Sequence, residues 1–136
     1  MLRSAAEAED AFYEAFAQQD VEAMMQVWAT DRSIFCIHPG GQLLTGREEV
    51  EESWKQIFQA EVPFHFEREY HYRDELADQF AISHLTETLY LRHHIVGIVL
   101  ATNIYCGTDE GWRMIMHHAS PPPGPDEPES GGPVLH

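Results

Sequence analysis

The stretch from Trp112 to Pro121 constrains the fold of this chain most, because it reads as the last strand of a sheet and ends in two adjacent histidines. Ahead of it come two short helical patterns, a His-Pro-Gly-Gly turn at 38–41, a third helical pattern and a run of long strands. Neighbouring residues on a strand point to opposite faces, so His117 and His118 cannot both face one site. The order of elements predicts an α+β fold with helices packed on a curved, mostly antiparallel sheet.

Three helices are predicted from their caps and apolar spacing. Ser4 with Glu7, and Thr45 with Glu48, have capping-box spacing, and Asp20 suits the N-cap of the second helix. Each cap precedes apolar residues at helical spacing, which are typical of core. The three stripes are Ala8, Phe12, Ala15 and Phe16; Val21, Met24, Met25 and Trp28; and Val50, Trp54, Ile57 and Phe58. Trp28, Trp54 and Phe58 are expected to wall a pocket as well.

About five strands are predicted, at 33–38, 64–73, 80–92, 95–106 and 112–119. In the second, alternation places Phe64, Phe66, Tyr70 and Tyr72 on one side, together with the charged Arg68. The strand at 95–106 is apolar on both faces, which indicates that both faces are covered. Helices cover only one face of such a sheet. We therefore expect a partner subunit on the other, in a homodimer.

The chain divides into one domain at 1–120 and a tail at 121–136. The tail contains six prolines, three glycines and three acidic residues, and this composition predicts disorder. A proline-rich peptide ligand is the alternative interpretation of the tail. Cys36 and Cys106 lie inside apolar strand patterns, which favours buried free thiols over a disulfide bridge.

The composition also limits the partners of the protein. A formal net charge of −15 argues against nucleic acid and against an anionic membrane surface. The longest apolar run, at 95–101, is far shorter than the ~20 residues of a membrane span. The first ten residues turn acidic at once and lack the apolar segment of a secretion signal. These features predict a soluble, cytoplasmic protein.

Nine histidines suggest metal binding, but the pattern of potential ligands does not support it. The sequence contains no HExxH motif, no CxxC motif and no compact ligand triad. The adjacent pairs at 93–94 and 117–118 each split across a sheet. We expect no metal and no cofactor.

Several polar residues interrupt apolar strands and are candidates for a site. One of His117 and His118 is expected to line a pocket, the other to be a packing or interface residue. His38, before the glycine turn, fits either a pocket rim or an ordinary turn. His84 and Asn103 lie amid apolar residues, so they either bond each other across the sheet or face a wet pocket, and the pocket is the interpretation that we favour.

Glu87 is the one acid in the middle of a strongly apolar strand, between Leu85 and Leu89. A buried carboxyl with a raised pKa would suit a general base, whereas a salt bridge across a dimer interface is the simpler interpretation. Alternation places Glu87 on the face opposite His84. Arg68 could pair with Glu87 or bind an anionic ligand group.

Much of the chain resembles the SnoaL-like branch of the NTF2-like superfamily, whose members form a cone around one pocket. The resemblance rests on 11–29, on Phe-Cys-Ile-His-Pro-Gly-Gly at 35–41 with Gly46 and Arg47, on Ser53 with Trp54, and on 101–105 and 111–121. The chain also resembles the association domain of calcium/calmodulin-dependent protein kinase II. The positions of that domain's pocket arginines fall on His84, Asn103 and Ala119, so the arginines themselves are missing.

The resemblance implies a protein with an interior small-molecule pocket, possessing acid–base activity of the isomerase, cyclase or hydratase type. In that interpretation His84, His117 or His118 is the acid or base, and Asn103 and Tyr105 donate hydrogen bonds to an oxyanion. Ketosteroid isomerases of this fold use an aspartate base, whereas the aspartates at 31, 74, 78 and 109 read as turn residues, so that mechanism does not carry over. A non-catalytic association module is the alternative.

Overall fold

The computed structural model describes residues 1–60, 64–77 and 79–122, and the tail predicted to be disordered lies almost wholly outside these residues. Its three helices are α1 (Ala5–Gln18), α2 (Val21–Val27) and α3 (Gly46–Ile57), followed by one 3₁₀ turn (Phe58–Ala60). Its six strands are β1 (Phe35–Ile37), β2 (Leu44–Thr45), β3 (His65–Leu76), β4 (Phe80–Leu91), β5 (His94–Thr108) and β6 (Gly111–Ser120). The predicted α+β class is confirmed.

The helix caps follow the sequence in two cases and depart from it in the third. The hydroxyl of Ser4 accepts from the backbone N–H of Glu7, and the Asp20 carboxylate caps α2. Thr45 occupies the N-cap position of α3 but makes no side-chain cap. Instead, the Glu49 carboxylate accepts from the backbone N–H of Thr45 at 2.9 Å. The predicted capping box at Thr45 is therefore wrong.

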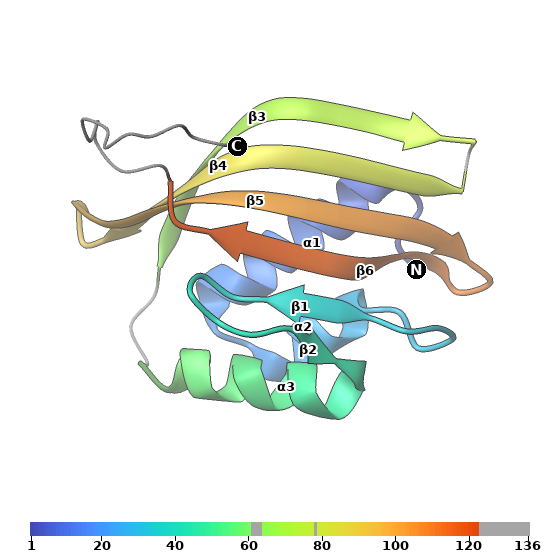
Figure 1. Cartoon of the computed structure of the whole chain (residues 1–136), viewed down its shortest axis with the longest axis horizontal. Coiled ribbons are helices and arrows are strands. Elements are labelled where there is room, and N and C mark those ends of the chain that lie inside the picture. The colour runs from blue at the N-terminus through green and yellow to red at the C-terminus, as the bar shows by residue number, and fades with distance from the viewer. Residues whose placement is uncertain (61–63, 78, 123–136) are drawn as a thin grey trace, which may run out of the picture.

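All six strands form one sheet in the order β2-β1-β6-β5-β4-β3. The pairs are antiparallel except β1 with β6, which run parallel. Figure 1 shows α1 behind the sheet and α3 along the edge formed by β2. The sequence predicted about five strands; the additional one is the two-residue β2, which is too short to show alternation.

A β-bulge in β3 decides which side chains reach the helix-covered face. The register shifts between Tyr70 and Tyr72, so that Tyr70 pairs with Leu85 and Tyr72 with His84. Tyr72 is consequently half-exposed and lies on the face away from the helices, contrary to the predicted alternation. The same shift turns Arg73 toward α1, because a one-residue slip moves every following side chain to the other face.

The helix-covered face of the sheet and the apolar faces of the helices form one core. The predicted stripes supply much of it, including Phe12, Met24, Trp28, Val50 and Trp54, each fully buried. On the opposite face and at the β4–β5 hairpin, large apolar side chains remain exposed: Ile95, Val96 and Ile98. The expected dimer, which would cover them, stays a prediction.

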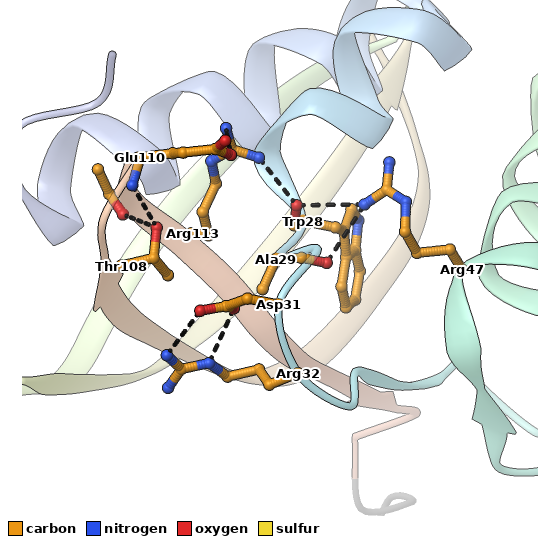
Figure 2. A network of polar contacts seen from close by, with 9 residues as sticks. Trp28, Ala29, Asp31, Arg32, Arg47, Thr108, Glu110 and Arg113 are labelled. Atoms are coloured by element: carbon orange, nitrogen blue, oxygen red, sulfur yellow. Dashed lines mark hydrogen bonds and ion pairs between the residues drawn. The ribbon is translucent and has the colours of Figure 1, made fainter.

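Two arginines satisfy the carbonyl groups at the end of α2. The Arg47 guanidinium donates to the carbonyl oxygens of Met25, Trp28 and Ala29, at 2.8, 3.2 and 3.3 Å, and Arg113 donates to Trp28 at 3.2 Å. Figure 2 shows both guanidinium groups converging on this turn. Helix ends leave such carbonyls without intrahelical partners, so these contacts fix α2 against α3 and β6.

Within the described residues, no helix is both long and apolar enough to cross a membrane.

Candidate functional site

A small apolar cavity of about 200 Å³ lies between the sheet and the ends of α1 and α3. Among its lining residues, three carry side chains that can transfer or accept protons: His38, Glu87 and His117. The remaining lining residues are apolar: Phe16, Pro39, Ile57, Phe64, Phe66, Leu89, Gly97, Val99 and Ala119. Binding sites commonly combine an apolar wall with a few such polar groups.

Glu87 is the acidic group of the cavity. It is 3% exposed and accepts a hydrogen bond from the Tyr13 hydroxyl at 2.5 Å. Burial raises the pKa of Glu87 to about 7, although the hydrogen bond from Tyr13 opposes the shift by favouring the carboxylate. Burial also raises the pKa of Tyr13 well above its usual value, so the phenol remains a donor. Glu87 can therefore change its protonation state near neutral pH.

Behind the cavity wall, Asn103 links two parts of a buried polar cluster. Its side-chain nitrogen donates to Glu9 at 3.0 Å and to the Tyr13 oxygen at 2.9 Å. Its side-chain oxygen lies 2.6 Å from Nδ1 of His117. All hydrogen-bonding atoms of this amide are thus engaged, and its orientation is set by the two acceptors on its nitrogen.

The same amide fixes the tautomer of His117. Because the Asn103 oxygen can only accept, Nδ1 of His117 carries the proton, and Nε2 of the neutral ring is an acceptor. Burial, together with the neighbouring His38 and His118, lowers the pKa of His117 to about 3. A nitrogen of such low basicity is a poor general base, so His117 is better suited to accept a hydrogen bond and orient a ligand.

His38 is fixed in the same way by α3. Ser53 donates its hydroxyl proton to the carbonyl of Val50 at 2.7 Å, so it can only accept from Nε2 of His38 at 2.9 Å. The neutral His38 ring therefore has an unprotonated Nδ1. Burial lowers the pKa of His38 to about 4. The His38 and His117 ring centroids lie 6.3 Å apart, so the cavity contains two neutral imidazoles.

A larger hollow of about 340 Å³ lies at the other end of α1 and reaches the same cluster from the opposite side. Glu9, which is 1% exposed, accepts there from Tyr105 at 2.7 Å and from Ser83 at 2.6 Å. Arg73 approaches it at 3.5 Å. We favour the smaller cavity as the site, because the Glu9 carboxylate is already bonded to several protein donors, whereas Glu87 has one donor within the described part of the chain.

The structure brings together only some of the residues predicted to bind a ligand. Trp28 packs under α2 away from the cavity, and Trp54 and Phe58 form a second layer, in which the Trp54 ring meets His38 edge-on at 4.8 Å. Arg68 bonds Asp10 and the Tyr70 hydroxyl. Arg68 lies opposite Glu87 in the β3–β4 register, and its charge acts to lower the pKa of that carboxyl, but its ion pair is with Asp10. Its role as an anion-binding group stays a prediction.

His84 and His118 lie on the face away from the cavity. In the register, His84 pairs with Thr102, and Thr102 pairs with His118, while Asn103 pairs with Ser83 and His117. His84 bonds the Thr102 hydroxyl at 3.1 Å. The prediction that His84 and Asn103 both face the interior is therefore wrong for His84. Of the adjacent pair at 117–118, only His117 faces inward.

Among the described residues, no three metal-binding side chains are grouped as an ion would require.

Asn103 and Tyr105, which were predicted to donate hydrogen bonds to a ligand, are buried and bond Glu9, and neither lines the smaller cavity. The predicted interface salt bridge of Glu87 is excluded by its position beneath α1, where Tyr13 is its partner. Two residues of α1 were missed. Glu9 precedes Phe12 by three positions and Phe16 by seven, so it falls inside the apolar stripe, and Tyr13 follows it by four. An acid inside a stripe was the signal that could have identified the cluster.

Three helices on a curved mixed sheet, around an interior cavity, define an α+β cone of the NTF2-like type. Residues 6–124 match the SnoaL-like domain family, and the chain belongs to that family.

Known structures and proteins support this placement. A candidate calcium/calmodulin-dependent protein kinase type II association domain from Thiobacillus denitrificans is 35% identical, covering 90% of this chain and 98% of that one, with a TM-score of 0.82. A candidate dehydratase of the NTF2-like family from Streptomyces avermitilis is 31% identical, covering 88% and 94%, with a TM-score of 0.77. The F-box protein SKIP8 of Arabidopsis thaliana is 29% identical over 109 residues. That match covers 80% of this chain but only 46% of the plant protein, so this chain spans about half its length.

Proposed function

We propose that this protein binds a small molecule in the 200 Å³ cavity and catalyses proton transfer on it, with Glu87 as the acid–base group. The observation that carries the proposal is a buried carboxyl that lines a largely apolar cavity, accepts a hydrogen bond from one phenol and has a pKa of about 7. A catalytic pKa near the working pH maximises the efficiency of general acid–base catalysis. The likeness to a candidate dehydratase supports the same class of chemistry.

The arrangement suits a reaction in which one carboxyl handles one proton. In a dehydration, the Glu87 carboxylate would take a proton from carbon, and the resulting carboxylic acid would return it to the hydroxyl group that leaves as water. In an isomerisation, it would return the proton to another carbon. Tyr13 and Asn103 act as positioning residues, because they orient Glu87 and His117 without lining the cavity.

The two buried free cysteines, Cys36 and Cys106, are consistent with a reducing, cytoplasmic location.

The proposal is tested by finding ligands and then following proton exchange. Small neutral compounds that raise the melting temperature are incubated with the protein in D₂O, and exchange of carbon-bound protons is followed by ¹H NMR. We expect Glu87→Gln to reduce the exchange rate at least ~100-fold, the range typical of a lost general base. Glu69→Gln, an exposed acid on β3, is the matched control and should leave the rate unchanged. Equal rates in wild type and Glu87→Gln would refute the catalytic role.

A second candidate function is self-association. It is favoured by the exposed Ile95, Val96 and Ile98, and by the 35% identity to a candidate association domain. We expect light scattering at micromolar concentration to give about twice the mass of one chain, because closed two-fold pairing is the commonest way to cover such a face. Ile98→Lys should shift the particle toward the mass of one chain. A strictly monomeric wild-type protein would contradict this second function.

A further inference from the structure

The cavity is small enough to limit the size of its ligand. A cavity of about 150 Å³ accommodates a benzene ring, so 200 Å³ has room for a ring with a short substituent, or about eight to ten non-hydrogen atoms. A steroid, with roughly twice as many atoms, exceeds that space. The ligand class is therefore narrower than the fold alone would indicate.

The charges around the cavity disfavour an anion. The described residues that line the cavity include no lysine or arginine, and Glu87 itself becomes negative above its pKa of about 7. Arg68, the cation paired with Glu87 across β3 and β4, is engaged by Asp10 and Tyr70. A carboxylate ligand would thus lose its hydration without meeting a positive partner, which is costly in an apolar site.

The hydrogen-bonding groups of the cavity are chiefly acceptors. The protons of His38 and His117 point to Ser53 and Asn103, respectively, so each ring keeps one unprotonated nitrogen. Neither of those nitrogens has a hydrogen-bond partner among the described residues. The Glu87 carboxylate is also an acceptor. A ligand that donates a proton would complement these groups, whereas one that only accepts would leave them unpaired.

We infer that the cavity selects an uncharged alcohol or phenol of about eight to ten non-hydrogen atoms, whose hydroxyl proton is accepted by one of the two imidazoles. This inference rests on the proposed function, because it names the ligand class of the same site. The hydroxyl group is also the group that a dehydration removes.

The test compares three compounds of similar size by ligand-observed NMR at pH 8.5: benzyl alcohol, which donates; acetophenone, which only accepts; and benzoate, which is an anion. At this pH Glu87 is mostly a carboxylate. We expect benzyl alcohol to bind at least ~10-fold more tightly than acetophenone, and benzoate to bind most weakly. At pH 5.5 protonated Glu87 can donate, so the preference for benzyl alcohol over acetophenone should narrow.

Two variants assign the binding to the cavity. Val99 lines it, so Val99→Phe should fill the space and abolish binding of benzyl alcohol. Leu43→Phe places the same ring at a half-exposed position outside the cavity and should leave binding intact. If acetophenone or benzoate bound best at pH 8.5, and Val99→Phe abolished that binding, the ligand class would be wrong and the site would stand. If none of the three bound, or if binding survived Val99→Phe, the cavity itself would be rejected, and the proposed function with it.

Discussion

Glu9→Ala is expected to lower the free energy of unfolding by about 4 kcal/mol, measured by urea denaturation. The Glu9 carboxylate accepts from three buried donors, on Ser83, Asn103 and Tyr105. Removing it leaves the Ser83 and Tyr105 hydroxyl groups, and one of the two N–H groups of Asn103, without that acceptor. Each stranded buried donor costs roughly 1–3 kcal/mol, and relaxation of the side chains recovers part of the sum.

Asp10→Ala is the control, because it also removes a carboxylate, at the next position of the same helix. The Asp10 side chain is 70% exposed and, among the described residues, pairs with Arg68 alone, so its loss should cost less than about 1 kcal/mol. Alanine gains more helix propensity over aspartate than over glutamate, but by less than about 1 kcal/mol, so a difference of several kcal/mol between the variants reports the buried cluster. If Glu9→Ala lowered the free energy of unfolding as little as Asp10→Ala, the buried cluster would contribute little to stability.

The sequence predicted the helices and the long strands well, because their signals are local. Caps at Ser4 and Asp20, and stripes such as Phe12 with Phe16, depend on neighbours within one or two turns. The additional strand β2 was missed because two residues carry no alternation. Glu9 was missed because an acid on a helix is usually solvent-exposed.

The site was harder to predict, because it depends on register between strands. His84 and Asn103 were assigned to one face, yet His84 pairs with Thr102, and the one-residue difference sends the two side chains to opposite faces. The bulge after Tyr70 is equally invisible in the alternation of β3. Sequence reasoning established that the pair at 117–118 splits across the sheet, but only the pairing of β5 with β6 selects His117 as the inward residue.

The last prediction concerns pH, and its sign follows from the raised pKa of Glu87. Burial raises this pKa from 4.5 to about 7, so the folded state holds a proton that the unfolded state has released between those values. Stability contributed by Glu87 is therefore fully present below about pH 4.5 and is lost as the pH rises through 7. The ionised group should cost the folded state roughly 3 kcal/mol at pH 8.

His38 and His117 act in the opposite direction at lower pH. Their pKa values are lowered from 6.5 to about 4 and 3, so as the pH falls the unfolded state binds these protons before the folded state does. Stability contributed by the two histidines therefore rises with pH up to about 6.5. The wild-type curve alone thus mixes three groups. Both wild type and Glu87→Gln contain the two histidines. The contribution of the histidines therefore cancels in the difference between the free energies of unfolding of the two proteins.

We expect that difference, measured by urea unfolding from pH 4 to pH 8.5, to be nearly constant below pH 4.5. Above pH 4.5, the free energy of unfolding of Glu87→Gln should rise steadily relative to that of wild type until about pH 7, by roughly 3 kcal/mol in all. Glutamine keeps an oxygen that can accept from Tyr13 but cannot ionise. Glu69→Gln, exposed on β3, should show no such change. A flat difference for Glu87→Gln would mean that Glu87 titrates as an ordinary carboxyl, and the acid–base role proposed for it would lose its physical basis.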